Sequence, residues 1–161
     1  MSTSDSCLIK QAIALFEKTP YSLLAFIARF SIAAVFWKSG QTKVEGIAID
    51  LINGTFELGT PRLAASTLPL FRSEYHVPLL SPEVAAYMAA FAEHFFPVLI
   101  LVGLATRFSA LALIGMTLVI QLFVYPDAYP THGTWIALLL LLVAKGPGSL
   151  SIDQLIARRY R

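Results

Sequence analysis

Residues 84–103 read VAAYMAAFAEHFFPVLILVG, an almost unbroken apolar run with Glu93 and His94 side by side at its centre. Twenty residues in a helix rise about 30 Å, which is enough to cross the hydrocarbon core of a bilayer. A carboxyl group and an imidazole at mid-membrane depth are costly unless they are paired or buried in protein. This stretch therefore predicts a transmembrane helix with a polar centre that has either a structural or a functional role.

The composition of the whole chain agrees with a membrane location. Of its 161 residues, 57% are hydrophobic and 14% are charged. Soluble domains typically have about 45–50% apolar residues and about 25% charged residues. The only charge is Arg29 in residues 19–37, Glu93 in residues 84–106 and Asp127 in residues 108–144. This pattern predicts an integral membrane protein. Cys7 is the only cysteine, so an internal disulfide is excluded.

The low-charge tracts predict an all-α fold, a four-helix transmembrane bundle that forms one membrane domain over residues 1–161. We expect the spans at residues 21–40, 84–103, 108–125 and 133–145. The outer loop, residues 42–83, is too long to be structureless and is expected to form an extracytoplasmic cap. Residues at 44, 47, 48, 51 and 52 follow a helical period, which predicts an amphipathic helix there. Amphipathic character also predicts a helix near residues 8–16, and Ser151 is placed to cap a last helix.

Basic residues indicate the topology. Lys10, Lys18, Arg107 and Lys145 would lie on one side of a four-span protein, together with the basic tail. Because cytoplasmic flanks carry an excess of Lys and Arg, we expect both termini in the cytoplasm.

Arg29 and Glu93 are predicted to form an ion pair within the membrane, since each lies nine or ten residues from the start of its span. An unpaired charge at this depth costs about 3 kcal/mol, and pairing at about 4 Å returns about 4 kcal/mol. With His94 and Gln121, these residues form the expected intramembrane polar core. Two roles stay open for the pair, a packing lock and a proton-handling or ligand-anchoring site.

A second polar group is expected near the outer mouth. An aromatic pocket there would suit a quinone head group. Asp127 and His132 suggest a divalent metal, but their spacing matches no dedicated motif, so no metal site is assigned; interfacial anchoring explains the same residues without a ligand. Glu74 and His76 lie nearby in the sequence. The candidates for the outer pocket are Trp37, Lys38, Gln41, Lys43, Tyr125, Asp127, His132 and Trp135.

Other kinds of site are not indicated. His94 and His132 differ in depth by about 15 Å, which disfavours a haem held by two histidines. The sequence shows no Ser/His/Asp nucleophile, phosphate-binding loop or basic nucleic-acid patch, so catalytic residues stay unassigned and nucleic acid is not an expected partner.

Several stretches together resemble the DoxX family of small bacterial membrane proteins. They are FWKSGQTKV at residues 36–44, the run from residue 78 to residue 135, and KGPGSLSID at residues 145–153. Arg29, Gly40, Lys43 and Glu93 stand at positions where the family pattern has the same residue types. The resemblance implies a four-helix bundle in the bacterial inner membrane.

The resemblance also implies a function, a subunit of a quinone-linked membrane oxidoreductase system. The alternative is a non-catalytic membrane partner in the maturation of metal-binding peptides or in a stress response. A third reading is a small enzyme that itself passes electrons to quinone. The expected partners are the lipid bilayer and proteins of one such complex, and a homo-oligomer stays open; quinone is the one candidate cofactor.

Overall fold

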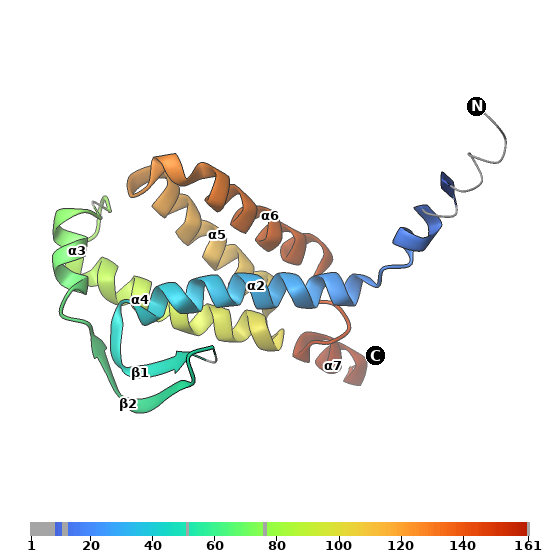
Figure 1. Cartoon of the computed structure of the whole chain (residues 1–161), viewed down its shortest axis with the longest axis horizontal. Helices are drawn as coiled ribbons and strands as arrows, with labels where there is room; N and C mark the ends of the chain where they lie inside the picture. Colours follow the sequence, from blue (N-terminus) through green and yellow to red (C-terminus); the bar gives the residue numbers. More distant parts are fainter. Residues whose placement is uncertain (1–8, 11–12, 51, 76, 161) are drawn as a thin grey trace.

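The computed structural model describes residues 9–10, 13–50, 52–75 and 77–160. Four long helices lie side by side and account for most of the molecule (Figure 1). The expected helix over residues 8–16 lies partly outside the described residues, but residues 9–10 and 13–17 are helical. The long helices are α2 (Tyr21–Gln41), α4 (Pro82–Val102), α5 (Thr106–Phe123) and α6 (Tyr129–Lys145).

All four helices contribute to one apolar core. Ala25 and Ile32 of α2 are fully buried with Ile100 of α4, Leu113 of α5 and Leu139 of α6. Small residues such as Ala25 let the helix backbones approach, as is usual where lipid provides no hydrophobic driving force between helices.

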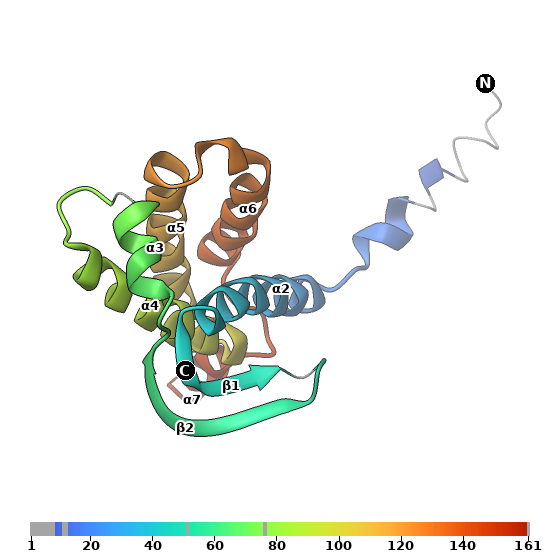
Figure 2. The ribbon, with the colours of Figure 1, turned by 60° about the vertical axis from the view of Figure 1, so that its left-hand side comes forward.

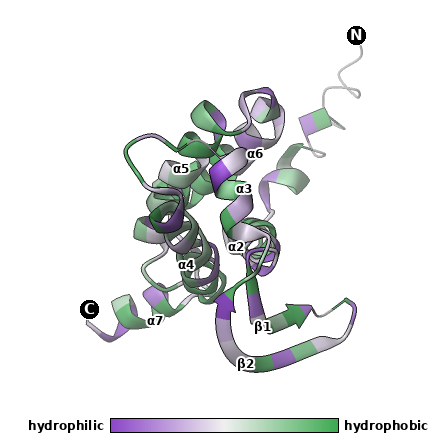
Figure 3. Cartoon of the chain, turned by 90° about the vertical axis from the view of Figure 1, so that its left-hand side faces the viewer, coloured by the Kyte–Doolittle hydropathy of each residue, from purple (hydrophilic) through white to green (hydrophobic). Residues whose placement is uncertain are grey.

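Within the described residues, three helices are long and apolar enough to span a membrane, namely α2, α4 and α5. The helix α6 has 17 residues and is slightly shorter. Hydrophobic residues run along the long helices (Figure 3). Many of their large apolar side chains are exposed, among them Ile27, Phe91 and Leu122. In a membrane protein such side chains contact lipid. The chain is therefore a mostly helical integral membrane protein, while the expected four-helix transmembrane bundle is confirmed only in part.

The predicted amphipathic helix after α2 is wrong, because residues 44–63 form a β-hairpin and the fold is not all-α. Strand β1 (Val44–Asp50) pairs antiparallel with β2 (Thr55–Leu63). Asp50 accepts hydrogen bonds from the backbone N–H groups of Ile52 and Asn53 at 2.9 and 3.0 Å, which closes the turn. The Asn53–Gly54 dipeptide is a strong hairpin signal, and it outweighs the helical spacing of the apolar residues.

The rest of the outer loop packs near the start of α4. The short helix α3 (Thr67–Ser73) buries Phe71 against Ala85 and Ala86. Helix α4 begins two residues before the predicted span, with Ser81 as the N-cap and Pro82 in the first turn. The hairpin lies on the opposite side of α2 and α4 from α5 and α6 (Figures 1 and 2). The cap is thus part strand and part helix.

The chain ends in helix α7 (Ile152–Arg159), capped by Ser151 as predicted. Asp153 accepts hydrogen bonds from the backbone N–H groups of Ala105 and Thr106 at 2.8 and 2.9 Å. A carboxylate at this position satisfies donors that a helix start leaves open and also favours the helix dipole. The tail therefore holds the turn between α4 and α5 in place.

We predict that Gly103→Ala destabilises the protein by about 1–2 kcal/mol, because Gly103 has a φ of 73° that side chains other than glycine disfavour. Its added Cβ would also collide with Ser151. Gly115→Ala is the matched control, since nothing lies within 4 Å of its Cβ position. Thermal unfolding in detergent should show a lowered midpoint for the first variant only. Equal midpoints would contradict this account of the turn.

Candidate functional site

A buried ion pair joins the end of α2 to the middle of α4. The Nζ atom of Lys43 lies 2.8 Å from Oε2 of Glu93 and 3.1 Å from Oε1. Only the contact with Oε1 has hydrogen-bond geometry, so Oε2 contributes to the pair through its charge. The side chains are 8% and 2% exposed. Because a buried charge without a partner is costly, this pair is a strong constraint on how the two helices pack.

Neighbouring groups complete the surroundings of the ion pair. The ammonium of Lys43 donates to the hydroxyl and the backbone carbonyl of Ser39 at 3.1 and 3.2 Å. Ser39 in turn donates to Oε1 of Glu93 at 3.1 Å. Gly40 allows the close approach of the helices, because a Cβ there would lie 2.7 Å from the ring of His94. The three N–H donors of the ammonium thus all have acceptors within the protein.

The predicted ion pair between Arg29 and Glu93 is wrong. The guanidinium of Arg29 donates to the backbone carbonyls of Leu101, at 2.9 Å, and of Leu150. Arg29 lies in the middle of α2, whereas Lys43 follows the end of this helix. Since α2 and α4 are antiparallel and Glu93 pairs with Lys43, Arg29 comes to lie at the end of α4. It caps carbonyl groups there that have no partner within the helix.

His94 lies in a second cluster, which attaches the hairpin. Its Nδ1 donates to the carbonyl of Ala90 at 2.7 Å, and its Nε2 accepts from Gln41 at 2.9 Å. The backbone N–H of Ile49 donates to the side-chain oxygen of Gln41 at 3.0 Å. The backbone carbonyl of Ile49 accepts a hydrogen bond from the indole N–H of Trp37 at 3.1 Å. Both ring nitrogens of His94 are occupied, so this cluster has a structural role.

The sequence predicts that Gln121 shares a polar core with Arg29, Glu93 and His94. In the structure it lies apart from them. Its amide N–H donates to the carbonyl of Pro126 at 2.5 Å, and its Oε1 lies 2.7 Å from Nδ1 of His132. The polar residues are therefore distributed over separate clusters. The reason is that α5 brings Gln121 to the start of α6, away from the contact between α2 and α4.

The expected outer pocket is also divided. Tyr125 donates to the carboxylate of Glu74 and lies 3.2 Å from the hydroxyl of Tyr75, which connects the turn after α5 to the end of α3. The hydrogen bond to Glu74 raises the pKa of Tyr125 above its usual value, with Tyr75 as a second cause, so the phenol stays protonated. Lys38 and Asp127 are exposed, and His76 lies outside the described residues.

A cavity of about 440 Å³ lies between the helices beneath the cap. Its walls are mostly apolar, and Ser39, Lys43 and Glu93 form one polar part of the lining. Four of the predicted outer residues line it, namely Lys43, Tyr125, His132 and Trp135, whereas Trp37, Lys38, Gln41 and Asp127 do not. Aromatic rings of Phe36, Phe96 and Trp135 face it from three helices.

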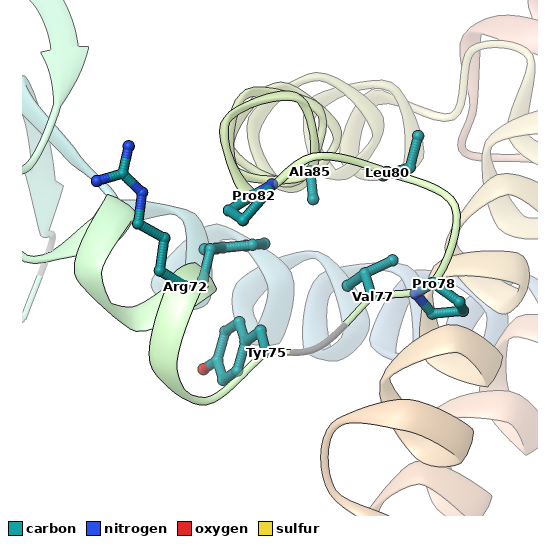
Figure 4. Close-up of a pocket in the computed structure, with 8 residues that line it drawn as sticks. Arg72, Tyr75, Val77, Pro78, Leu80, Pro82 and Ala85 are labelled. Carbon is teal, nitrogen blue, oxygen red and sulfur yellow. The ribbon is translucent and has the colours of Figure 1, made fainter.

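The outer end of this cavity adjoins a smaller hollow of about 340 Å³ (Figure 4). Tyr75, Val77 and Leu80 contribute to the walls of both. These residues belong to the segment between α3 and α4, so the cap forms one end of the cavity. Among the described residues, no three His, Cys, Asp or Glu side chains are grouped so that they could hold a metal ion.

Comparison with known proteins identifies the family. The DoxX family model matches residues 24–126, which is more than half of the chain. The chain belongs to the DoxX family. It is also 31% identical over 90 residues to an uncharacterized protein of Haemophilus influenzae, covering 51% of this chain and 60% of that protein. No solved structure matches the chain.

The structure gives roles to the residues that carry the DoxX resemblance. Lys43 and Glu93 form the buried pair, Gly40 permits the helix contact, and Arg29 and Asp153 hold the two ends of the turn after α4. Ser39 was not among the predicted site residues, although it lies four residues before Lys43 at the end of α2. Lys43 was predicted in the outer pocket, and it both lines the cavity and pairs with Glu93.

We predict strong coupling between Lys43 and Glu93 in a double-mutant cycle. Lys43→Met leaves a buried carboxylate without its partner and should cost about 3–5 kcal/mol. Adding Glu93→Gln should restore much of this loss. The midpoint of chemical unfolding in detergent measures each variant.

Arg29→Met provides the control cycle. Because Arg29 does not contact Glu93, Arg29→Met and Glu93→Gln should have additive effects, within about 0.5 kcal/mol. Coupling in this second cycle, or additivity in the first, would contradict the arrangement described above.

Proposed function

We propose that this DoxX protein is the membrane subunit of a quinone-linked oxidoreductase system, in which it binds the quinone and a partner protein supplies the electrons. The cavity under the cap is the observation that supports this function. A quinone is reduced to the quinol by two electrons and two protons, and this chain would provide the place where the head group is held during that exchange.

The residues of the cavity fit a quinone. Its volume of about 440 Å³ lies in the range of small-molecule sites, which are mostly apolar with few polar groups. Phe36, Phe96 and Trp135 offer aromatic surfaces for a flat ring. Among the described residues none accepts a hydrogen bond from the indole N–H of Trp135, so this group is available to a quinone carbonyl. His132 adds a second polar group at the same wall.

The position of the cavity also suits a ligand that arrives from the bilayer. Met88 of α4 and Val119 of α5 line the cavity and are 56% and 37% exposed at the outer surface of the helices. A lipid-soluble molecule can therefore enter between α4 and α5. The Lys43–Glu93 pair and the ring of Trp135 would then meet its head group rather than its tail.

We propose the membrane topology that the sequence predicts, with α6 as the fourth span of a single membrane domain in the bacterial inner membrane. Its 17 residues rise about 26 Å, close to the thickness of the hydrocarbon core. Arg107, Lys145 and the arginines of α7 then lie on the cytoplasmic side with both termini. The alternative role in the maturation of metal-binding peptides has no comparable structural observation in its favour.

We predict that the purified protein binds decylubiquinone and that Ala92→Phe, which fills part of the cavity, weakens binding at least tenfold. Val98→Phe is the matched control, because Val98 is on the same helix, 46% exposed and outside the cavity. Isothermal titration calorimetry in detergent measures both. Undetectable binding to the wild-type protein, or equal effects of the two substitutions, would refute the proposed site.

The partner is tested separately by extraction from native membranes in mild detergent and mass spectrometry of the proteins that remain bound. We expect a subunit of an oxidoreductase. Recovery of a peptide-modifying enzyme instead would favour the alternative function.

A further inference from the structure

His132 is a buried residue, and among the described residues only one of its two ring nitrogens has a hydrogen-bond partner. It lies in the first turns of α6, is 4% exposed and lines the cavity. Its ring lies 5.0 Å from that of Trp135, centroid to centroid. Its position in the cavity wall makes it the residue most able to define which head group is bound.

The hydrogen bonds around Gln121 determine the tautomer of His132. The amide N–H of Gln121 donates to the carbonyl of Pro126 at 2.5 Å, so its oxygen must point to the other side. That oxygen lies 2.7 Å from Nδ1 of His132 and can only accept. In the neutral ring, Nδ1 therefore carries the proton, and Nε2 is left with a lone pair and no hydrogen.

This acceptor belongs to a residue of the cavity wall. Gln121, which binds Nδ1, does not line the cavity, whereas His132 does. Nε2, away from the contact with Gln121, is therefore the ring nitrogen left for a partner in the cavity. Among the residues that the structure describes, none donates a hydrogen bond to Nε2. A ligand in the cavity that supplies a donor to this nitrogen gains the free energy of that hydrogen bond.

We infer that the cavity selects a ligand whose head group carries a hydroxyl, and that it binds the hydroquinone form of its ligand more tightly than the quinone. The inference rests on the proposed function. The two forms have nearly the same size and shape but differ at the oxygen atoms, since only the hydroquinone has O–H donors. The hydroxyl donates to Nε2 of His132, whereas a carbonyl oxygen placed there would meet a second acceptor.

The test compares matched ligands by calorimetry under anaerobic conditions. We expect decylubiquinol to bind about tenfold more tightly than decylubiquinone, the effect of one hydrogen bond to an otherwise unpaired group. A redox-inert pair, para-heptylphenol and its methyl ether, should show the same preference for the hydroxyl. Equal affinities within both pairs, or tighter binding of the forms without a hydroxyl, would overturn the inference.

Variants assign the preference to His132. His132→Phe should remove the preference, so that the ratio of the affinities for decylubiquinol and decylubiquinone falls about tenfold, to near one. Tyr129→Phe is the control, because it removes a hydroxyl on the same helix that is 69% exposed and outside the cavity. A preference that survives His132→Phe would overturn the role of His132.

The two proposals fail in different ways. If quinone and quinol bind equally well, the quinone-binding function stands and only the selectivity is wrong. If neither form binds to the wild-type protein, the proposed function and the inference that rests on it are both wrong.

Discussion

The ion pair of Lys43 and Glu93 determines how the other parts of this molecule are placed. Two opposite charges inside a low-dielectric protein can lie only next to each other, so the end of α2 must meet the middle of α4. The hairpin then begins beside the centre of α4. The first turns of α4 extend past the start of the hairpin and pack against α3. The same register brings Arg29 to the last carbonyl groups of α4, where it and Asp153 hold the turn.

The two histidines of the long helices differ in how many of their ring nitrogens are hydrogen-bonded within the protein. His94 has partners on both ring nitrogens, and Arg29 binds carbonyl groups at a helix end. His132 has a partner on one nitrogen only and lines an apolar cavity. The free nitrogen of His132 belongs to a residue of the cavity wall, on the side of α2 and α4 that faces α5 and α6. This is where we propose that a ligand binds.

Long apolar runs made the membrane helices predictable to within a few residues, and the cap at Ser151 followed from local sequence. The hairpin was missed because the apolar residues at 44, 47, 48, 51 and 52 follow a helical period, whereas apolar and polar residues do not alternate regularly along β1. The pairing of Glu93 was missed for another reason. Arg29 and Lys43 are both basic, and only the packing of α2 on α4 decides which one reaches the carboxylate. The cavity is lined by side chains from four helices, so no local sequence pattern could predict it.

The most direct test of the account is a measurement of the Lys43–Glu93 contact in a lipid bilayer. Solid-state nuclear magnetic resonance with ¹⁵N-labelled lysine side chains and ¹³C-labelled glutamate carboxyl groups detects the dipolar coupling between such a pair. The account predicts a strong coupling that is present in the wild-type protein and lost in Glu93→Gln. If the wild-type protein shows no lysine–glutamate coupling that depends on Glu93, or if ¹⁵N-labelled arginine shows the coupling instead, the packing described here is contradicted.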